Sequence, residues 1–291
     1  MSEKTTIALI GAGGKMGGRI IDNLSKGDDR LLLCEHTEHG IARIRAKGLD
    51  VTPNEEAVPQ ADYIVMAVPD ALIGAISKAL VPLMKPGATL ITLDPAAAYA
   101  GQLEARDDCT FVVTHPCHPP LFGELNTPEE RADVFGGIAA KQDIVIALHQ
   151  GEQARFEAAE RICIRMFSPV VKCHRVTVEQ MAIMEPAMAE VVAAMAASLM
   201  KEALDETIKL GVPEEAARAF MLGHVQIPLN IVFNGTNPFS DAAQIAIQYG
   251  YEKIIRPDWK QVFTKASMDE VLRRMLHLDD RIDAAGDEQG A

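Results

Sequence analysis

The chain has 291 residues, of which 48% are hydrophobic and 5% aromatic, and its formal net charge is −13 at pH 7. This length allows one large or two ordinary domains, and the acidic balance makes nucleic acid and anionic membranes poor partners. The five cysteines lack C-x-x-C spacing, so we expect reduced thiols. No apolar run approaches the about 20 residues of a membrane span, and the start, MSEKTT, lacks a signal region. We therefore expect a cytoplasmic protein.

The stretch 6–18, TIALIGAGGKMGG, predicts a buried strand, a glycine-rich turn and the start of a helix. Gly11 would permit the tight turn, Gly13 or Gly14 would let the backbone approach a pyrophosphate, and Gly17 would let the helix pack closely. The spacing fits both G-x-G and G-x-x-G-x-x-G, so the register of the phosphate contact stays open. We expect dinucleotide binding by Gly11, Ala12, Gly13, Gly14, Lys15 and Met16; the alternative is an ordinary glycine-rich turn.

A second apolar run, 31–34, ends at Glu35. A carboxylate at the end of the second strand binds the ribose 2′-hydroxyl and repels a 2′-phosphate. No basic residue follows at once, the nearest being Arg43 and Arg45, so we expect NAD rather than NADP. The alternative is a solvated glutamate at a strand end.

The first 175 residues alternate strands with helices, which is typical of a Rossmann-type α/β fold with a parallel, doubly wound sheet. Further strands are expected at 62–68, 89–93, 110–114, 143–148 and 170–173, with Val51 as another strand residue, and helices at 40–47, 54–58, 71–83 and 152–166. Ligands bind outside the carboxyl ends of such strands. The strand ends at 11–14, Glu35, Val68-Pro69-Asp70, Asp94-Pro95 and 115–120 should therefore line one crevice, with Val68 and Pro69 at the cofactor.

Residues 176–291 predict an all-α domain that serves the substrate and dimerisation, after an NAD-binding domain at 1–175. Its helices are expected at 178–210, interrupted at Pro186, at 214–233, interrupted at Pro228, at 241–249 with Ser240 as the N-cap, and at 268–281. The tail 283–291 should be disordered. The long Ala- and Met-rich face favours a homodimer; packing within the chain is the alternative.

The sequence HPCHPP places His115 and His118 at the carboxyl end of a predicted strand. Histidines in this position can be metal ligands, general bases or substrate hydrogen-bond donors, while the plainer alternative is a polar loop. Two histidines with this spacing do not identify a metal site. Glu185, beside Pro186 in an apolar helix, is the best candidate for a further ligand, although an exposed glutamate is equally compatible. His224 lies in another apolar helix, where a satisfied core histidine is the alternative.

Four motifs together, GAGGKMG, VPD, THPCHPPLF and VEQMAIMEP, resemble one family over essentially the whole chain. It comprises NAD-dependent oxidoreductases with a domain like the C-terminal domain of decarboxylating phosphogluconate dehydrogenase. The resemblance implies NAD-dependent oxidation of a branched sugar acid, D-apionate, with a coupled ketol-type rearrangement. The C2 alcohol would become a ketone, and a hydroxymethyl group would migrate from C3 to give 3-oxo-isoapionate. Such chemistry suits a divalent metal as Lewis acid.

One departure from the phosphogluconate dehydrogenase pattern affects the expected site. The G-x-x-x-K-x-x-x-N helix is missing; its place offers Glu185, and Lys201 lies further along. We therefore expect a divalent metal, Zn²⁺ being the first candidate, on His115 and Glu185, and proton transfer by His118 and His224. The alternatives are a plain hydroxyacid or prephenate-type dehydrogenase without rearrangement, and an NAD-sensing regulatory protein without chemistry.

Overall fold

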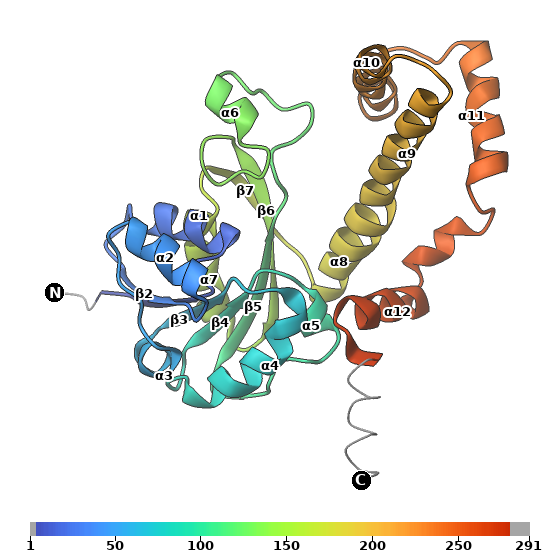
Figure 1. Cartoon of the computed structure of the whole chain (residues 1–291). Coiled ribbons are helices and arrows are strands. Elements are labelled where there is room, and N and C mark those ends of the chain that lie inside the picture. The colour runs from blue at the N-terminus through green and yellow to red at the C-terminus, as the bar shows by residue number, and fades with distance from the viewer. Residues whose placement is uncertain (1–3, 280–291) are drawn as a thin grey trace, which may run out of the picture. The chain divides into compact units, whose positions relative to one another are not determined.

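The computed structural model describes residues 4–279, and residues 6–175 contain a seven-stranded sheet with helices on both faces (Figure 1). The strand order is β2-β1-β3-β4-β5-β6-β7. The strands are β1 (Thr6–Ile10), β2 (Arg30–Cys34), β3 (Tyr63–Met66), β4 (Thr89–Thr92), β5 (Thr110–Pro116), β6 (Gln142–Gln150) and β7 (Val170–Arg175). This confirms the predicted Rossmann-type α/β fold.

The sheet is mixed rather than parallel throughout, which corrects one expectation. Strands β1 to β5 are parallel, whereas β6 runs antiparallel to β5, and β7 is parallel to β6. The β5–β6 connection contains only the five-residue helix α6 (Pro128–Ala132), which is too short for a crossover. The chain therefore returns into the sheet in the opposite direction.

The other helices of this region follow the predicted order. They are α1 (Lys15–Leu24), α2 (Glu38–Ala46), α3 (Asn54–Ala57), η1 (Val58–Gln60), α4 (Asp70–Leu80), η2 (Val81–Leu83), α5 (Ala96–Tyr99) and α7 (Gln153–Met166). The short helices α5 and α6 lack a periodic apolar pattern and were not predicted. Val51 belongs to no strand; it packs as a partly buried residue against the core, so the expectation of a strand there is wrong.

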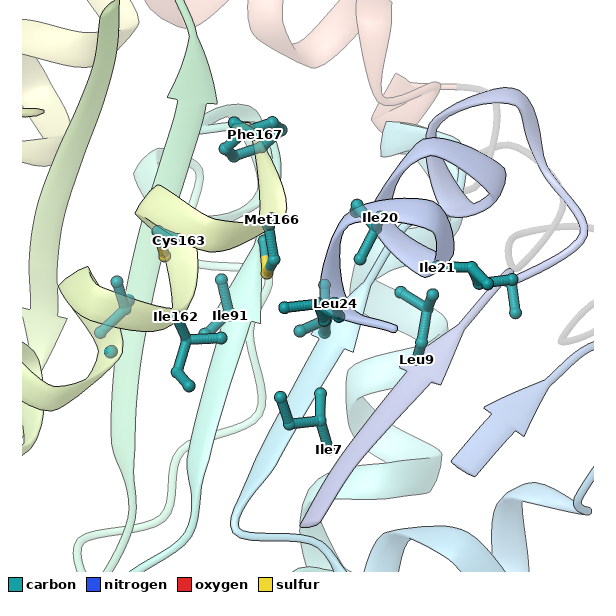
Figure 2. Packing of buried hydrophobic residues seen from close by; sticks show 14 of the residues in the cluster. Ile7, Leu9, Ile20, Ile21, Leu24, Ile91, Ile162, Cys163, Met166 and Phe167 are labelled. Atoms are coloured by element: carbon teal, nitrogen blue, oxygen red, sulfur yellow. The ribbon is translucent and has the colours of Figure 1, made fainter. Parts of the chain in front are cut away.

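The core forms two layers because alternate residues of each strand point to opposite faces of the sheet. Ile7 and Leu9 of β1 join the layer under α1 and α7, whereas Ala8 and Ile10 join the layer under α3 and α4. Figure 2 shows the first layer, where side chains of α1 and α7 meet those of the strands. Burial on both faces explains why these strands read as continuous apolar runs.

The helical region begins with a continuous helix made of α8 (Val178–Ala182), the π-helical segment η3 (Ile183–Ala194) and α9 (Met195–Lys209). This confirms the helix predicted at 178–210. Pro186 lies inside η3, where the wider turn accommodates its missing N–H, so the chain does not break there. The helices α10 (Glu214–Asn234), α11 (Asp241–Ile254), η4 (Trp259–Phe263) and α12 (Lys265–Met275) follow, and Pro228 leaves α10 uninterrupted. The end of the predicted helix at 280–281 and the tail lie outside the described residues.

The chain divides into two compact units. The first comprises Met1–Ile183 and Asp269–Ala291, and the second comprises Met184–Met268. The C-terminal part of α12 belongs to the first unit because Leu272 and Leu276 pack with Ala96 and Ala182. The boundary predicted at residue 175 separates an NAD-binding domain from a domain for substrate binding and dimerisation. This functional division stays a prediction.

The helix Val178–Lys209 has 32 residues and, by length and composition alone, is apolar enough to cross a membrane. The expectation concerned an uninterrupted apolar run, whereas this helix includes charged residues such as Glu185 and Glu190. Helices that pack against other helices pass the same test, so the observation by itself is weak evidence for a membrane span.

Candidate functional site

The glycine turn after β1 is fixed by contacts that require small residues. Gly11 has φ +76°, its N–H donates to the Cys34 carbonyl over 2.9 Å, and a Cβ on it would lie 2.4 Å from the Ala67 oxygen. The Ala12 N–H donates to the same carbonyl over 3.1 Å. Gly17 packs against this turn, since its Cβ would lie 2.4 Å from the Gly11 oxygen. The sequence Gly-x-x-x-x-x-Gly here therefore sets the shape of the turn as well as the start of α1.

Gly13 and Gly14 have different packing neighbours in the turn. A Cβ on Gly13 would lie 2.4 Å from the Gly40 Cα, so Gly13 is needed for close packing of the turn against α2. Gly14 is the N-cap of α1. A Cβ on Gly14 would lie 3.1 Å from the Gly11 oxygen, so this position is less restricted than that of Gly13. The phosphate contact by Gly13 or Gly14 stays a prediction. Lys15 and Met16 follow as the first helical residues of α1, where free N–H groups favour anions.

Glu35 follows β2 as predicted, and its carboxylate is held by main-chain donors. One oxygen accepts the Gly13 N–H over 3.1 Å, and the other accepts the His36 and Thr37 N–H groups, both over 2.9 Å. Burial alone would raise the pKa of Glu35, but these hydrogen bonds outweigh burial and lower the pKa. The side chain is therefore an anion that also ties the glycine turn to the start of α2.

A cavity of about 500 Å³, the β1–β2 cavity, opens at the carboxyl ends of the first strands. Its walls include Gly11, Glu35, Val68 and Arg45. The strand order changes direction at β1, which is where doubly wound sheets bind their ligands. Pro69 follows Val68 in the chain as the N-cap of α4 and is not among the residues that line the cavity. Arg45 comes ten residues after Glu35, and α2 brings it to the same cavity.

His115 lies at the end of β5, next to the end of β4. Its Nδ1 is 2.9 Å from the Leu93 carbonyl oxygen, and since a carbonyl only accepts, Nδ1 must carry the proton. The Nε2 lone pair is then available. Burial, with a smaller contribution from neighbouring His118, lowers the pKa of His115 to about 4, although the Leu93 hydrogen bond acts in the opposite direction. His115 is thus a neutral imidazole near pH 7, suited to accept a hydrogen bond or bind a metal.

His118 lies near His115, as the sequence predicts. The two ring centroids are 6.0 Å apart and the rings are perpendicular. The backbone of His118 has φ +62°, which is uncommon for a residue with a side chain, and its Nδ1 donates to the Phe135 carbonyl over 2.9 Å. His118 also lines a second cavity of about 490 Å³, together with Cys117 and Lys141.

Glu185 and His224 belong to the second unit. Glu185 is half-buried in η3. His224 is exposed on α10, where its Nδ1 donates to the Phe220 carbonyl over 2.9 Å and its ring stacks on Phe220 at 3.8 Å, so it is not a core histidine. Within residues 4–279, no group of three or more His, Cys, Asp or Glu gathers in a way that could hold a metal. The joint roles of these residues with His115 and His118 stay predictions.

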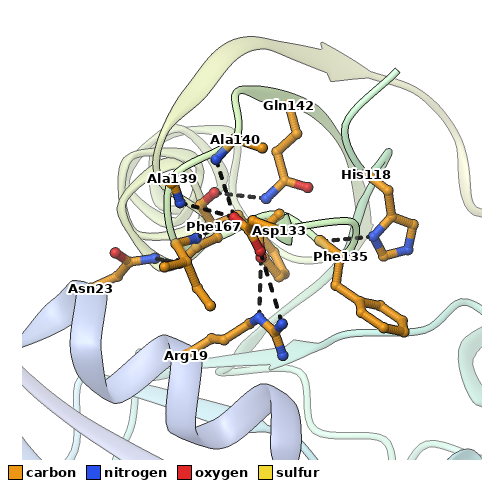
Figure 3. Close-up of polar contacts among 12 residues, drawn as sticks. Arg19, Asn23, His118, Asp133, Phe135, Ala139, Ala140, Gln142 and Phe167 are labelled. Carbon is orange, nitrogen blue, oxygen red and sulfur yellow. Dashed lines mark hydrogen bonds and ion pairs between the residues drawn. The ribbon is translucent and has the colours of Figure 1, made fainter. Parts of the chain in front are cut away.

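The loop Asp133–Ala140 was not predicted to belong to the site, yet it contacts both α1 and His118 (Figure 3). It carries the Phe135 carbonyl, and the Arg19 and Asn23 side chains bind its backbone. The contacts of Arg19 and Asn23 join residues more than 100 positions apart. In the sequence of this loop, only the consecutive glycines Gly136 and Gly137, three residues after Asp133, indicate an unusual backbone.

Family models match both parts of the chain. Residues 124–276, just over half of the chain, match the family described as phosphogluconate dehydrogenase (decarboxylating) C-term. Residues 6–93, which contain the glycine turn and Glu35, match the family described as NADP oxidoreductase coenzyme F420-dependent.

The chain is also similar to curated relatives over nearly its whole length. It is 47% identical to the D-apionate oxidoisomerase of Pectobacterium atrosepticum, with 96% of this chain and 98% of that protein covered. It is 43% identical to the D-apionate oxidoisomerase of Cupriavidus necator, with coverage of 94% and 99%. The crystal structure of a semialdehyde dehydrogenase NAD-binding protein from Cupriavidus necator in complex with calcium and NAD matches with a TM-score of 0.90, at 43% identity, over 94% of this chain and 100% of that chain.

Proposed function

Because this chain belongs to the family of the D-apionate oxidoisomerases, we propose that it oxidises D-apionate with NAD and rearranges the product to 3-oxo-isoapionate. The observation that carries the proposal is the identity of 41–47% to four such proteins over more than nine-tenths of the chain. The glycine turn, Glu35 and the paired histidines at the strand ends support the same chemistry.

The reaction has two steps that need the same oxygens held in place. First, the C2 hydrogen leaves as a hydride to the nicotinamide while the C2 hydroxyl loses its proton. In the rearrangement, the C3–CH2OH bond breaks and a C2–CH2OH bond forms, while the C3 hydroxyl loses a proton and the C2 oxygen gains one. We assign these proton transfers to His118 and His224, since the His118 Nδ1 donates to Phe135 and Nε2 is left as the ring nitrogen that can exchange a proton with the substrate.

We assign a divalent metal to His115 and Glu185. The donor chemistry of His115 fits a metal, because a ligating imidazole commonly donates its other N–H to a backbone carbonyl, as Nδ1 does to Leu93. When bound, the ion would act as a Lewis acid on the substrate oxygens. The depressed pKa of His115 keeps protons from competing for Nε2 near neutral pH.

The metal assignment is tested with the variants His115→Ala and Glu185→Gln. Both should lose metal content and several kcal/mol of transition-state stabilisation while NAD still binds. His118→Asn is the matched control, since asparagine tolerates the left-handed backbone and should keep the metal while turnover falls. Full turnover in both ligand variants, or in enzyme treated with a strong chelator, would contradict the assignment.

We propose NAD as the cofactor, with adenosine in the β1–β2 cavity beside Glu35. The Glu35 charge should favour NAD over NADP by at least about 1 kcal/mol through a gained hydrogen bond and an avoided repulsion, although Arg45 in the same cavity moderates the repulsion. Glu35→Gln keeps an acceptor for the Gly13 N–H and removes the charge. The affinity for NAD should then exceed the affinity for NADP by a smaller factor. Glu38→Gln, on the first turn of α2, is the control. A wild-type preference for NADP in a direct titration would refute the role of Glu35.

A further inference from the structure

The loop Asp133–Ala140 between α6 and β6 is held from within by one carboxylate. Asp133 is buried, and one of its oxygens accepts the N–H groups of Ile138, Ala139 and Ala140 over 2.9, 2.9 and 3.1 Å. Three main-chain donors on one oxygen fix the curvature of the loop, because each would otherwise lose its hydrogen bond on burial. The loop therefore has a defined shape.

Helix α1 holds the same loop from outside (Figure 3). The Arg19 Nε donates to the Gly136 carbonyl over 3.1 Å, and the Arg19 guanidinium lies 3.9 Å from Asp133. The Asn23 amide donates to the Gly137 carbonyl over 3.0 Å. The Lys15 ammonium lies 4.7 Å from the centre of the Phe135 ring, within the range of a cation–π contact. The loop is thus fixed to the helix that begins at the glycine turn.

The loop in turn holds His118. The Phe135 carbonyl accepts the His118 Nδ1–H over 2.9 Å, and the two rings meet edge to face at 6.0 Å. This contact supports a side chain whose own backbone is in the left-handed region at φ +62°. Such conformations persist where surrounding contacts fix them. The orientation of the Phe135 carbonyl depends on the next residue, Gly136, which has φ +71°.

We propose that the loop Asp133–Ala140 is a positioning element for the reaction, and that Gly136 is its positioning residue. By directing the Phe135 carbonyl at Nδ1, the loop keeps the His118 proton on Nδ1 and leaves Nε2 as the proton acceptor. Because Arg19 and Asn23 belong to α1, the position of the Phe135 carbonyl depends on the helix that follows the glycine turn. It does not depend on the segment around His118 alone. The inference rests on the proposed role of His118 in proton transfer.

The test uses Gly136→Ala, whose Cβ would be strained at positive φ and would lie 2.5 Å from the Gln142 side chain. Gly48→Ala is the matched control, because Gly48 has φ +73° and open space around its Cβ position. Nitrogen NMR of protein with labelled histidine rings reports the tautomer, with His118→Asn identifying the His118 signals. We expect Nδ1–H in the wild type and in Gly48→Ala, and mixed tautomers in Gly136→Ala.

Turnover of D-apionate should fall about tenfold in kcat for Gly136→Ala, with the Kd for NAD within about twofold of wild type. An Nε2–H tautomer in the wild type, or a tautomer and kcat in Gly136→Ala equal to those of Gly48→Ala, would overturn the proposal. If Gly136→Ala does not fold, Arg19→Gln decides by the same two measurements. The His118 tautomer can be measured without substrate. A wild type without turnover of D-apionate would therefore refute the proposed function, while the NMR comparison would still test the role of the loop.

Discussion

At the scale of single residues, His115 combines a fixed tautomer with a depressed pKa. Its Nδ1 proton is committed to Leu93, so any added proton must go to Nε2, and burial disfavours the resulting charge. The folded protein therefore resists protonation of His115 until about pH 4, whereas the unfolded chain takes up that proton near the ordinary value of 6.5. Folding and protonation of this ring oppose one another between these values.

This opposition predicts how stability depends on pH. The unfolded state binds more protons between pH 6.5 and 4, so the free energy of unfolding should fall as the pH drops through this window, by up to about 3 kcal/mol from His115. Above about pH 6.5 the contribution should be constant. The His115→Gln variant has no imidazole to protonate at this position. Its free energy of unfolding, measured with denaturant, should therefore fall less between pH 7 and pH 4.5. An equal loss in both proteins would show that His115 titrates normally.

At the scale of elements, the helices of the second unit carry exposed apolar side chains. Phe220, Leu222 and Phe233 of α10 and Ile245 and Ile254 of α11 are each at least 60% exposed. Large apolar side chains exposed in this number favour an interaction site. We propose that a second copy of the chain covers these faces in a cytoplasmic homodimer, which also explains the apolar character of the helix Val178–Lys209.

The dimer predicts a particle of twice the chain mass of 31.5 kDa in light scattering at micromolar concentration. Phe233→Asp, which places a charge on the exposed face of α10, should lower the mass toward that of one chain. Val171→Asp is the control, because Val171 is an equally exposed apolar residue in β7 of the first unit, and it should leave the mass unchanged. A wild-type particle with the mass of a single chain would exclude this arrangement.

At the scale of the whole molecule, the sequence predicted the elements better than their directions. Buried strands show as apolar runs, and their ends place Glu35, His115 and His118 correctly. The reversal at β6 could not be predicted, since the same apolar run suits either direction. Pro186 looked like a break because periodicity does not distinguish a π-helical stretch.

The site was predictable where it follows strand ends and unpredictable where it depends on distant contacts. The cofactor turn and the histidine pair follow from a general rule for doubly wound sheets. The internal bonds of Glu35, the packing of Gly13 on Gly40 and the loop held by Asp133 all depend on tertiary neighbours. No local pattern encodes such contacts, which is why the loop near His118 was missed.

The proposed function joins oxidation and carbon migration in one active site. The most direct test is carbon NMR of the product formed from D-apionate and NAD, with the hydroxymethyl carbons labelled and NADH followed by absorbance. We predict one NADH per product molecule and a new bond between C2 and a labelled carbon, as in 3-oxo-isoapionate. An unrearranged 2-oxo acid, with both labelled carbons still on C3, would show a plain dehydrogenase and contradict the account.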